Sequence, residues 1–183
     1  MPEPTYVSDA RSQLIEDLQF TLGEGPCVDA VRFGSPVLLD DVRTVSDAND
    51  RWPGFVKEIE ASGVRALFAF PVRVGAIALG TLDLYRDEPG TLSAGELAAA
   101  LRTVDQIASV LLDIGAAGGD GVAEHSYRMV VHQAAGMVMV QAGIGITTAL
   151  SRLRATAFSE GIAINDLAAD VVAGRRRLSE EER

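Results

Sequence analysis

Cysteine and histidine are scarce in this sequence. The 183 residues include one cysteine, Cys27, and two histidines, His125 and His132. One thiol cannot form a disulfide within the chain, and these three side chains do not have the spacing of zinc ligands. Cysteine redox catalysis would normally need a second thiol for turnover. We therefore expect no metal, no cofactor and no enzyme activity, and we expect Cys27 to be a buried structural residue.

Long apolar runs are also absent. No stretch approaches eighteen uninterrupted apolar residues, and residues 1–13 lack the charged-then-apolar order of a secretory signal. We accordingly expect a cytoplasmic protein with no membrane contact. The hydrophobic content of 48% and aromatic content of 5% are ordinary for a globular chain, and the length suits one large domain or two small ones.

Negative charge is unevenly distributed. Residues 1–120 carry nine basic and nineteen acidic side chains, whereas residues 121–183 carry seven of each. The net charge of −10 argues against nonspecific binding of polyanions, because phosphate affinity depends on clustered lysine and arginine. Arginines 152, 154 and 175–177 could still form a locally basic face in the second part.

The glycine-rich segment 115–121 is the one low-complexity stretch, and it predicts a linker between domains at 1–114 and 122–183. Before it, apolar periodicity predicts helices at 8–20, 53–62 and 93–114, the last opening with the capping box Ser93-x-x-Glu96. Strands are expected at 36–42, 64–74 and 76–85, the last two paired as an antiparallel hairpin around Gly75.

Three short helices are expected after the linker. Apolar residues at steps of three and four predict helices at about 126–141, 147–158 and 165–176, packed into a small core. About sixty residues bury only a modest apolar area, so this module is expected to lean on a neighbour or a second copy.

Several motifs carry a family resemblance. The stretch LGEGPCVDAVRFGSPVLLDDV, followed by GVRALFAFPV and GTLDLYRDEPGTLS, resembles the GAF sensory domains of actinobacterial regulators over residues 6–114. The tail HQAAGMVMVQAGIGITTALSRLRATAFSEGIAINDLAADVVAGRRR resembles the ANTAR module of transcription antitermination regulators over residues 127–177. The resemblance implies an α+β fold: an antiparallel-sheet sensor followed by an all-α three-helix module.

The resemblance also implies a function. Helical modules of this family bind paired stem-loops in a nascent transcript and stabilise an antiterminator, usually as dimers. This chain departs from the family at Ala134-Ala135, where lysine often follows the first alanine, and at Thr147-Thr148, where an acidic residue is common. The sensor also looks truncated, without the usual first helix and two strands, which would leave a sheet edge unpaired.

Candidate contact residues follow from side-chain chemistry. Arginine forks suit phosphates and guanine edges, and glutamine or histidine can read splayed bases. The RNA-binding candidates are Arg152, Arg154, Gln133, Gln141, Arg175, Arg176 and Arg177, with His132 as a further possibility. Phe158 could stack on a base, but its spacing favours the helical core.

A small-molecule pocket is expected on one face of the sensor sheet. Apolar walls with a few polar groups are typical of ligand sites. The candidates are Phe68, Phe70, Arg73, Thr81, Asp83 and Tyr85, with Trp52 as a closing residue. A filled core with Arg73 and Asp83 paired or solvated is the plainer alternative.

An RNA-binding antitermination regulator is the interpretation that the sequence favours. The competing hypothesis is a dimerising interaction protein that has a degenerate sensor and does not bind RNA itself. The neutral charge of residues 121–183 supports that second hypothesis.

Overall fold

The computed structural model describes residues 6–44, 46–116 and 129–178. The chain divides into two compact units, one built mainly from residues before Gly121 and the other mainly from residues after it. Most of the predicted linker and the predicted helix start at Ser126 lie outside the described residues. The first unit combines helices with an antiparallel sheet and the second is helical, so the predicted α+β class is confirmed.

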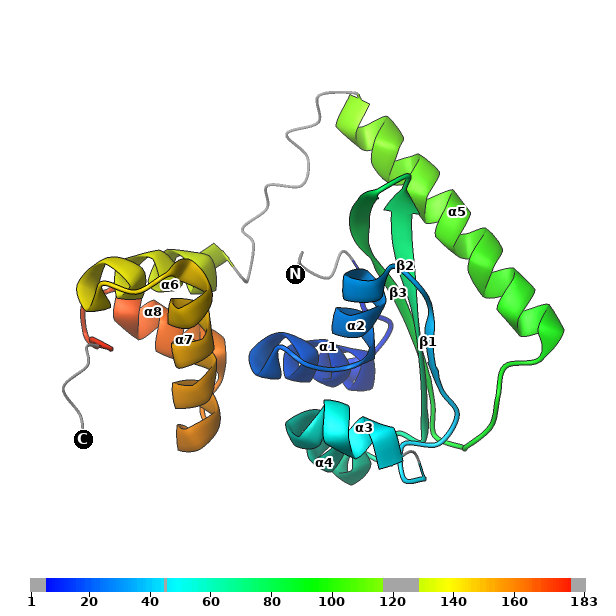
Figure 1. Ribbon diagram of the computed structural model, residues 1–183, viewed down its shortest axis with the longest axis horizontal. Coiled ribbons are helices and arrows are strands. Elements are labelled where there is room, and N and C mark those ends of the chain that lie inside the picture. Colours follow the sequence, from blue (N-terminus) through cyan, green and yellow to red (C-terminus); the bar gives the residue numbers. More distant parts are fainter. Residues whose placement is uncertain (1–5, 45, 117–128, 179–183) are drawn as a thin grey trace. The chain divides into compact units, whose positions relative to one another are not determined.

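The first unit is a three-stranded antiparallel sheet with helices on both faces (Figure 1). Its strands are β1 (Val37–Leu39), β2 (Ala66–Val74) and β3 (Ile77–Arg86), in the order β1-β2-β3. The β2–β3 hairpin turns at Gly75, where a φ of +58° favours glycine. The helices are α1 (Ala10–Leu22), α2 (Pro26–Phe33), α3 (Ser46–Arg51), α4 (Pro53–Ala61) and α5 (Ala94–Ala116).

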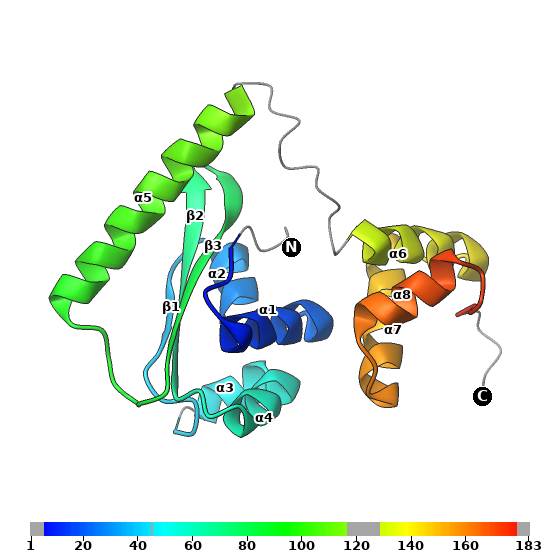
Figure 2. The same ribbon diagram turned by 180° about the vertical axis from the view of Figure 1, so that it is seen from behind.

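Two apolar layers hold this sheet. On one face, alternate residues of β2 pack against the buried side of α5, which runs along the sheet in both views (Figures 1 and 2). On the other face, Ala69 packs against Cys27 and Ala30 of α2. Helices α2 and α4 each have proline in the first turn. A backbone N–H in the first turn has no acceptor within the helix, so proline removes no hydrogen bond there. Helix α3 was missed by the sequence analysis, since SDANDR has no apolar periodicity.

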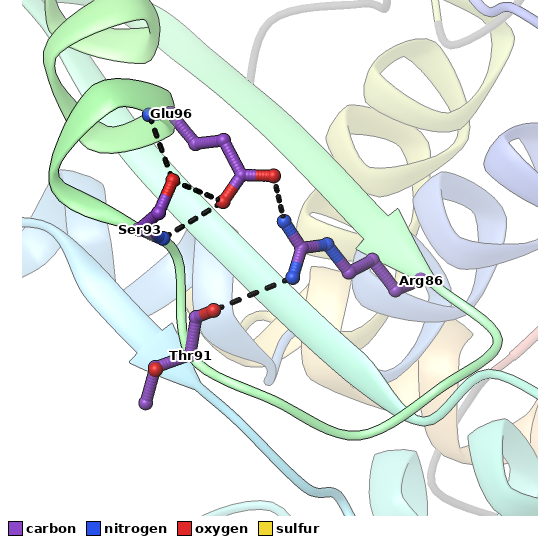
Figure 3. Close-up of polar contacts among 4 residues, drawn as sticks. All are labelled: Arg86, Thr91, Ser93 and Glu96. Atoms are coloured by element: carbon purple, nitrogen blue, oxygen red, sulfur yellow. Dashed lines mark hydrogen bonds and ion pairs between the residues drawn. The ribbon is translucent and has the colours of Figure 1, made fainter.

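The start of α5 is fixed by the predicted capping box. Glu96 accepts from the Ser93 backbone N–H at 2.7 Å, and the Glu96 N–H donates to Ser93 Oγ at 3.3 Å. Arg86, the last residue of β3, donates to Glu96 at 2.5 Å and to the Thr91 carbonyl at 3.3 Å (Figure 3). The hydrogen bonds from Ser93, and then Arg86, lower the pKa of Glu96 to about 2. These contacts tie α5 to the end of the sheet.

The second unit consists of α6 (Met129–Ala142), α7 (Ile146–Glu160) and α8 (Ile164–Val172). Its core is made of small and branched side chains, among them the fully buried Leu153, Leu167 and Val171. The expectation that Phe158 belongs to the core was wrong, because its side chain is 52% exposed. Helix α8 also ends four residues before the predicted end, because Gly174 takes a φ of +72° and turns the chain.

None of the described helices is by itself long and apolar enough to cross a membrane. Helices α6 and α7 reach that threshold only as a pair, and they are bent by 109° at the break between them.

Candidate functional site

Polar residues of β3 face α1 and α2 in the first unit. Strand alternation places Asp83 and Tyr85 on one side and Leu82 and Leu84 on the other, as the sequence predicted. The Asp83 carboxylate accepts from Gln19 Nε2 of α1 at 2.9 Å, and the Tyr85 hydroxyl donates to Asp9 at 2.9 Å. The polar side of β3 therefore docks on the N-terminal part of the chain.

The predicted pocket does not form as one site. Phe68 is paired with Leu84 and Phe70 with Leu82, so both phenylalanines point to the α5 face and are buried there. Arg73 is an odd number of residues from Phe68 and Phe70 in β2, so its side chain points to the other face of the sheet. It lies there beside Gly34, at the end of α2. Asp83 is paired with Ala69, which packs on α2, so Arg73 and Asp83 share that face. The prediction that Phe68 and Phe70 share it was wrong, because residues an odd number apart in a strand point to opposite faces.

Trp52 does not close the predicted pocket either. It is 3% exposed, packs edge-on against Phe55 with ring centroids 6.5 Å apart, and donates Nε1–H to Asp29 at 3.0 Å. Arg51 donates to the same carboxylate at 2.5 Å. Nothing in the sequence indicates that Asp29 is buried. A buried carboxylate needs donors such as Arg51 and Trp52, because burial without hydrogen bonds is costly. This network joins α2 to the α3–α4 region and makes Trp52 a structural residue.

A groove of about 410 Å³ runs between β3 and the first half of α5. Two of the predicted ligand residues, Phe68 and Tyr85, line it. The Arg86–Glu96 pair drawn in Figure 3 belongs to the same lining. The remaining lining residues are Leu82, Leu84, Leu92, Ala99, Ala100 and Thr103. The groove is therefore apolar with one ion pair at its wall, as expected of a ligand site.

The carboxyl group of Asp83 has a raised pKa. Burial raises its pKa to about 6, the Gln19 hydrogen bond opposes that rise, and the nearby Glu16 charge adds to it. Gln19 is 1% exposed and also accepts from the Cys27 backbone N–H at 2.8 Å. Asp83 therefore belongs to a buried polar contact between α1, α2 and β3.

The second unit carries a groove of about 620 Å³ along α6 and the end of α8. Gln133 and Gln141 both line it, since residues eight apart lie on one face of a helix. The lining between and beside them is Gly136, Met137, Val140 and Val172. Val140 is 76% exposed, which leaves an apolar surface between two amide side chains. The exposed side chain of His132 is not among the groove residues.

The arginine candidates are spread over two places. Arg152 donates to the Leu178 carbonyl at 3.2 Å, so the segment after α8 runs beside α7. Arg176 is paired with Glu160 of α7, and Arg175 with Asp170 at 2.6 Å. Arg177 is exposed in the same segment. Arg154 lies about 200° around α7 from Arg152, so these two do not form the single basic face that the sequence suggested.

Comparison with known families is consistent with this two-unit organisation. A family model described as GAF domain matches residues 3–112, and one described as ANTAR domain matches residues 123–172. No curated protein matches the chain. Among solved structures, a type II free methionine-R-sulfoxide reductase from Thermoplasma acidophilum is 22% identical over 50% of this chain and 59% of that chain, with a TM-score of 0.39. A likeness that weak carries no argument about activity.

Proposed function

Because this chain belongs to the GAF domain family and carries an ANTAR domain after it, we propose that it is an RNA-binding antitermination regulator controlled by its sensor. Both are regulatory domain types rather than catalytic ones. ANTAR domains bind RNA stem-loops, and the order of the two domains fits a sensor that controls an output module. The proposed target is a pair of stem-loops in a nascent transcript.

The groove of α6 and α8 is the observation that supports this proposal most. Single-stranded loops are read by hydrogen bonds to splayed bases and by stacking on apolar surface. Gln133 and Gln141 offer amide donors and acceptors two helical turns apart, with Met137 and Val140 between them. The groove can therefore accept an unstacked base and bond to its edge.

Arginines after α8 supply the phosphate contacts in this proposal. Val172 lines the groove, and Arg175 follows it by three residues, so the basic segment begins close to the groove's α8 end. Arg175 and Arg176 already pair with Asp170 and Glu160, and phosphates must compete with those carboxylates. We expect Arg177, which is exposed, to contribute more to affinity than either of them.

A gel shift with matched variants tests the proposal. The probe is an RNA with two adjacent stem-loops, beside a scrambled RNA of the same length. We expect Gln133→Ala/Gln141→Ala to weaken binding to the paired stem-loops by about 10-fold or more, since each lost base contact costs about 1–3 kcal/mol. Gln106→Ala, an exposed glutamine of α5, is the control. Equal binding by wild type and the double variant would place the RNA elsewhere.

The salt dependence of RNA binding separates the phosphate contacts of the arginines from the base contacts of the glutamines. Arg177→Ala should weaken binding to both RNAs and reduce the salt dependence by about one counterion, whereas Arg102→Ala on exposed α5 should change neither. No preference for the paired stem-loops in wild-type protein would favour the alternative, an interaction protein that uses the apolar groove for another protein.

A homodimer remains part of the proposal, because two stem-loops suit two copies of the ANTAR domain. Sedimentation of the purified protein at tens of micromolar tests it. A monomer at that concentration would overturn the dimer while leaving the RNA groove in place.

A further inference from the structure

Three side chains with metal-binding atoms meet inside the first unit. A carboxylate oxygen of Glu16 on α1, the Sγ of Cys27 on α2 and a carboxylate oxygen of Asp83 on β3 all lie within 4.8 Å of one another. Cys27 is 1% exposed, and Glu16 and Asp83 are half-buried. Two carboxylates and a thiol have therefore been brought together at a place that excludes most water.

The surroundings fix this cluster in place. Gln19 lies between its members, donating to Asp83 Oδ2 at 2.9 Å and accepting from the Cys27 N–H at 2.8 Å. Gly25, with a φ of +129°, lets the chain pass close to Gln19, because a Cβ there would stand 2.8 Å from the Gln19 side chain. The amide is thus held by both neighbours.

One oxygen of the cluster lacks compensation. Asp83 Oδ1 is buried from solvent and accepts no hydrogen bond of good geometry from the described residues, while Oδ2 accepts from Gln19. The side chains of Thr81 and Cys27 lie near enough to lower the Asp83 pKa, but they do not offset the effect of burial. A buried carboxylate oxygen without a donor is costly, and such atoms commonly mark an ion or a catalytic role. The raised pKa of Asp83 has the same origin, since burial and the Glu16 charge both act against the ionised form.

We infer that Glu16, Cys27 and Asp83 bind one divalent cation of borderline softness, of which Zn²⁺ is the type. Thiolate and carboxylate ligands together suit zinc, which takes three protein ligands and leaves a fourth position open. Zinc–ligand bonds of about 2.0–2.3 Å in a tetrahedron put ligand atoms about 3.5 Å apart. Ligand atoms within 4.8 Å of one another need to approach by up to about 1.3 Å, which side-chain adjustment supplies.

Binding would exchange a proton for the cation. The Cys27 thiol loses its proton to solvent as the metal–sulfur bond forms, and Asp83 Oδ1 becomes available as a ligand. The site would link α1 to both α2 and β3, so the cation adds stability to the first unit. This inference does not depend on RNA binding, because it concerns only residues of the sensor.

Cobalt titration of the full chain, with no affinity tag, tests the site. Co²⁺ bound by thiolate gives a charge-transfer absorption in the near ultraviolet, and Cys27 is the sole thiol. We expect this absorption to saturate at one Co²⁺ per chain and to be displaced by Zn²⁺. Cys27→Ser should abolish it, and Asp83→Asn or Glu16→Gln should weaken Co²⁺ binding at least 10-fold.

Exposed carboxylates provide the control. Asp87→Asn and Glu88→Gln lie just after β3 and should leave the Co²⁺ affinity unchanged. Trp52 fluorescence confirms that each variant is folded, and a variant that fails this check is replaced by Cys27→Ala or Glu16→Ala. Wild-type protein that is folded but shows no thiolate absorption at millimolar Co²⁺ would overturn the inference. Equal weakening by Asp83→Asn and Asp87→Asn would also overturn it.

Discussion

Removing the charge of Asp83 should stabilise the sensor at neutral pH and have little effect in acid. The pKa of Asp83 is raised from 3.8 to about 6 in the folded protein, so the folded state holds this proton more tightly than the unfolded chain. The stability contributed by Asp83 is therefore complete below pH 3.8 and is lost as the pH rises through about 6. A shift of this size corresponds to up to about 3 kcal/mol.

Asp83→Asn isolates that effect. The amide oxygen can still accept from Gln19, and the variant has no charge to bury. The free energy of unfolding of the variant relative to wild type should rise by up to about 3 kcal/mol between pH 4 and pH 7.5. Comparing the two proteins removes the opposite pH dependence of Asp9 and Glu96, whose pKa values are lowered to about 2.

Urea unfolding followed by Trp52 fluorescence gives the required values. Trp52 is the single tryptophan and is 3% exposed in the first unit, so its signal reports unfolding of the sensor. The measurements are made in EDTA, which keeps the Glu16–Cys27–Asp83 cluster free of metal. A stability difference that is the same at pH 4 and pH 7.5 would refute the claim that burial of Asp83 raises its pKa.

Three further variants test the packing. Leu153→Ala, at a fully buried position of α7, should destabilise the second unit by about 2–5 kcal/mol. The loss should be seen in helical circular dichroism, with the Trp52 signal unchanged. Loss of both signals together would contradict separate unfolding of the two units. Ser93→Ala should cost the first unit about 0.5–2 kcal/mol in urea unfolding through loss of the α5 cap, and Ser109→Ala, on the exposed side of α5, should cost much less. Trp52→Phe removes one of the hydrogen bonds to Asp29 Oδ2, which keeps its bonds from Arg51, and should cost about 1–3 kcal/mol by thermal unfolding. An unaltered melting temperature would argue against the Asp29 network.

Local patterns in the sequence predicted most of the elements. The hairpin at Gly75, the capping box at Ser93 and the apolar periodicity of α5 to α8 are all short-range signals, and the structure confirms them. Helix α3 has no such signal, because SDANDR lacks apolar spacing and depends on its neighbours. Phe158 misled for a related reason. Its spacing fits the core face of α7, but its side chain is 52% exposed.

Site prediction failed where it required knowledge of which strand faces which helix. Side chains alternate between the two faces along β2, so Phe68 and Phe70 point to one face and Arg73 to the other. This alternation alone would have shown that they cannot line one pocket. The cluster of Glu16, Cys27 and Asp83 had no sequence signal, since it joins three distant elements and zinc motifs are recognised by cysteine and histidine spacing. Gln133 and Gln141 were chosen for their amide chemistry, and both line the groove of α6 and α8; their contact with RNA stays a prediction.

Transcription with purified RNA polymerase tests the central claim most directly. The template carries two adjacent stem-loops followed by a terminator hairpin, and the protein is added before elongation. The account predicts that wild-type protein increases readthrough, that the increase requires both stem-loops, and that Gln133→Ala/Gln141→Ala reduces it while Gln106→Ala does not. Readthrough that is unchanged by the protein on the intact template would contradict an antitermination role.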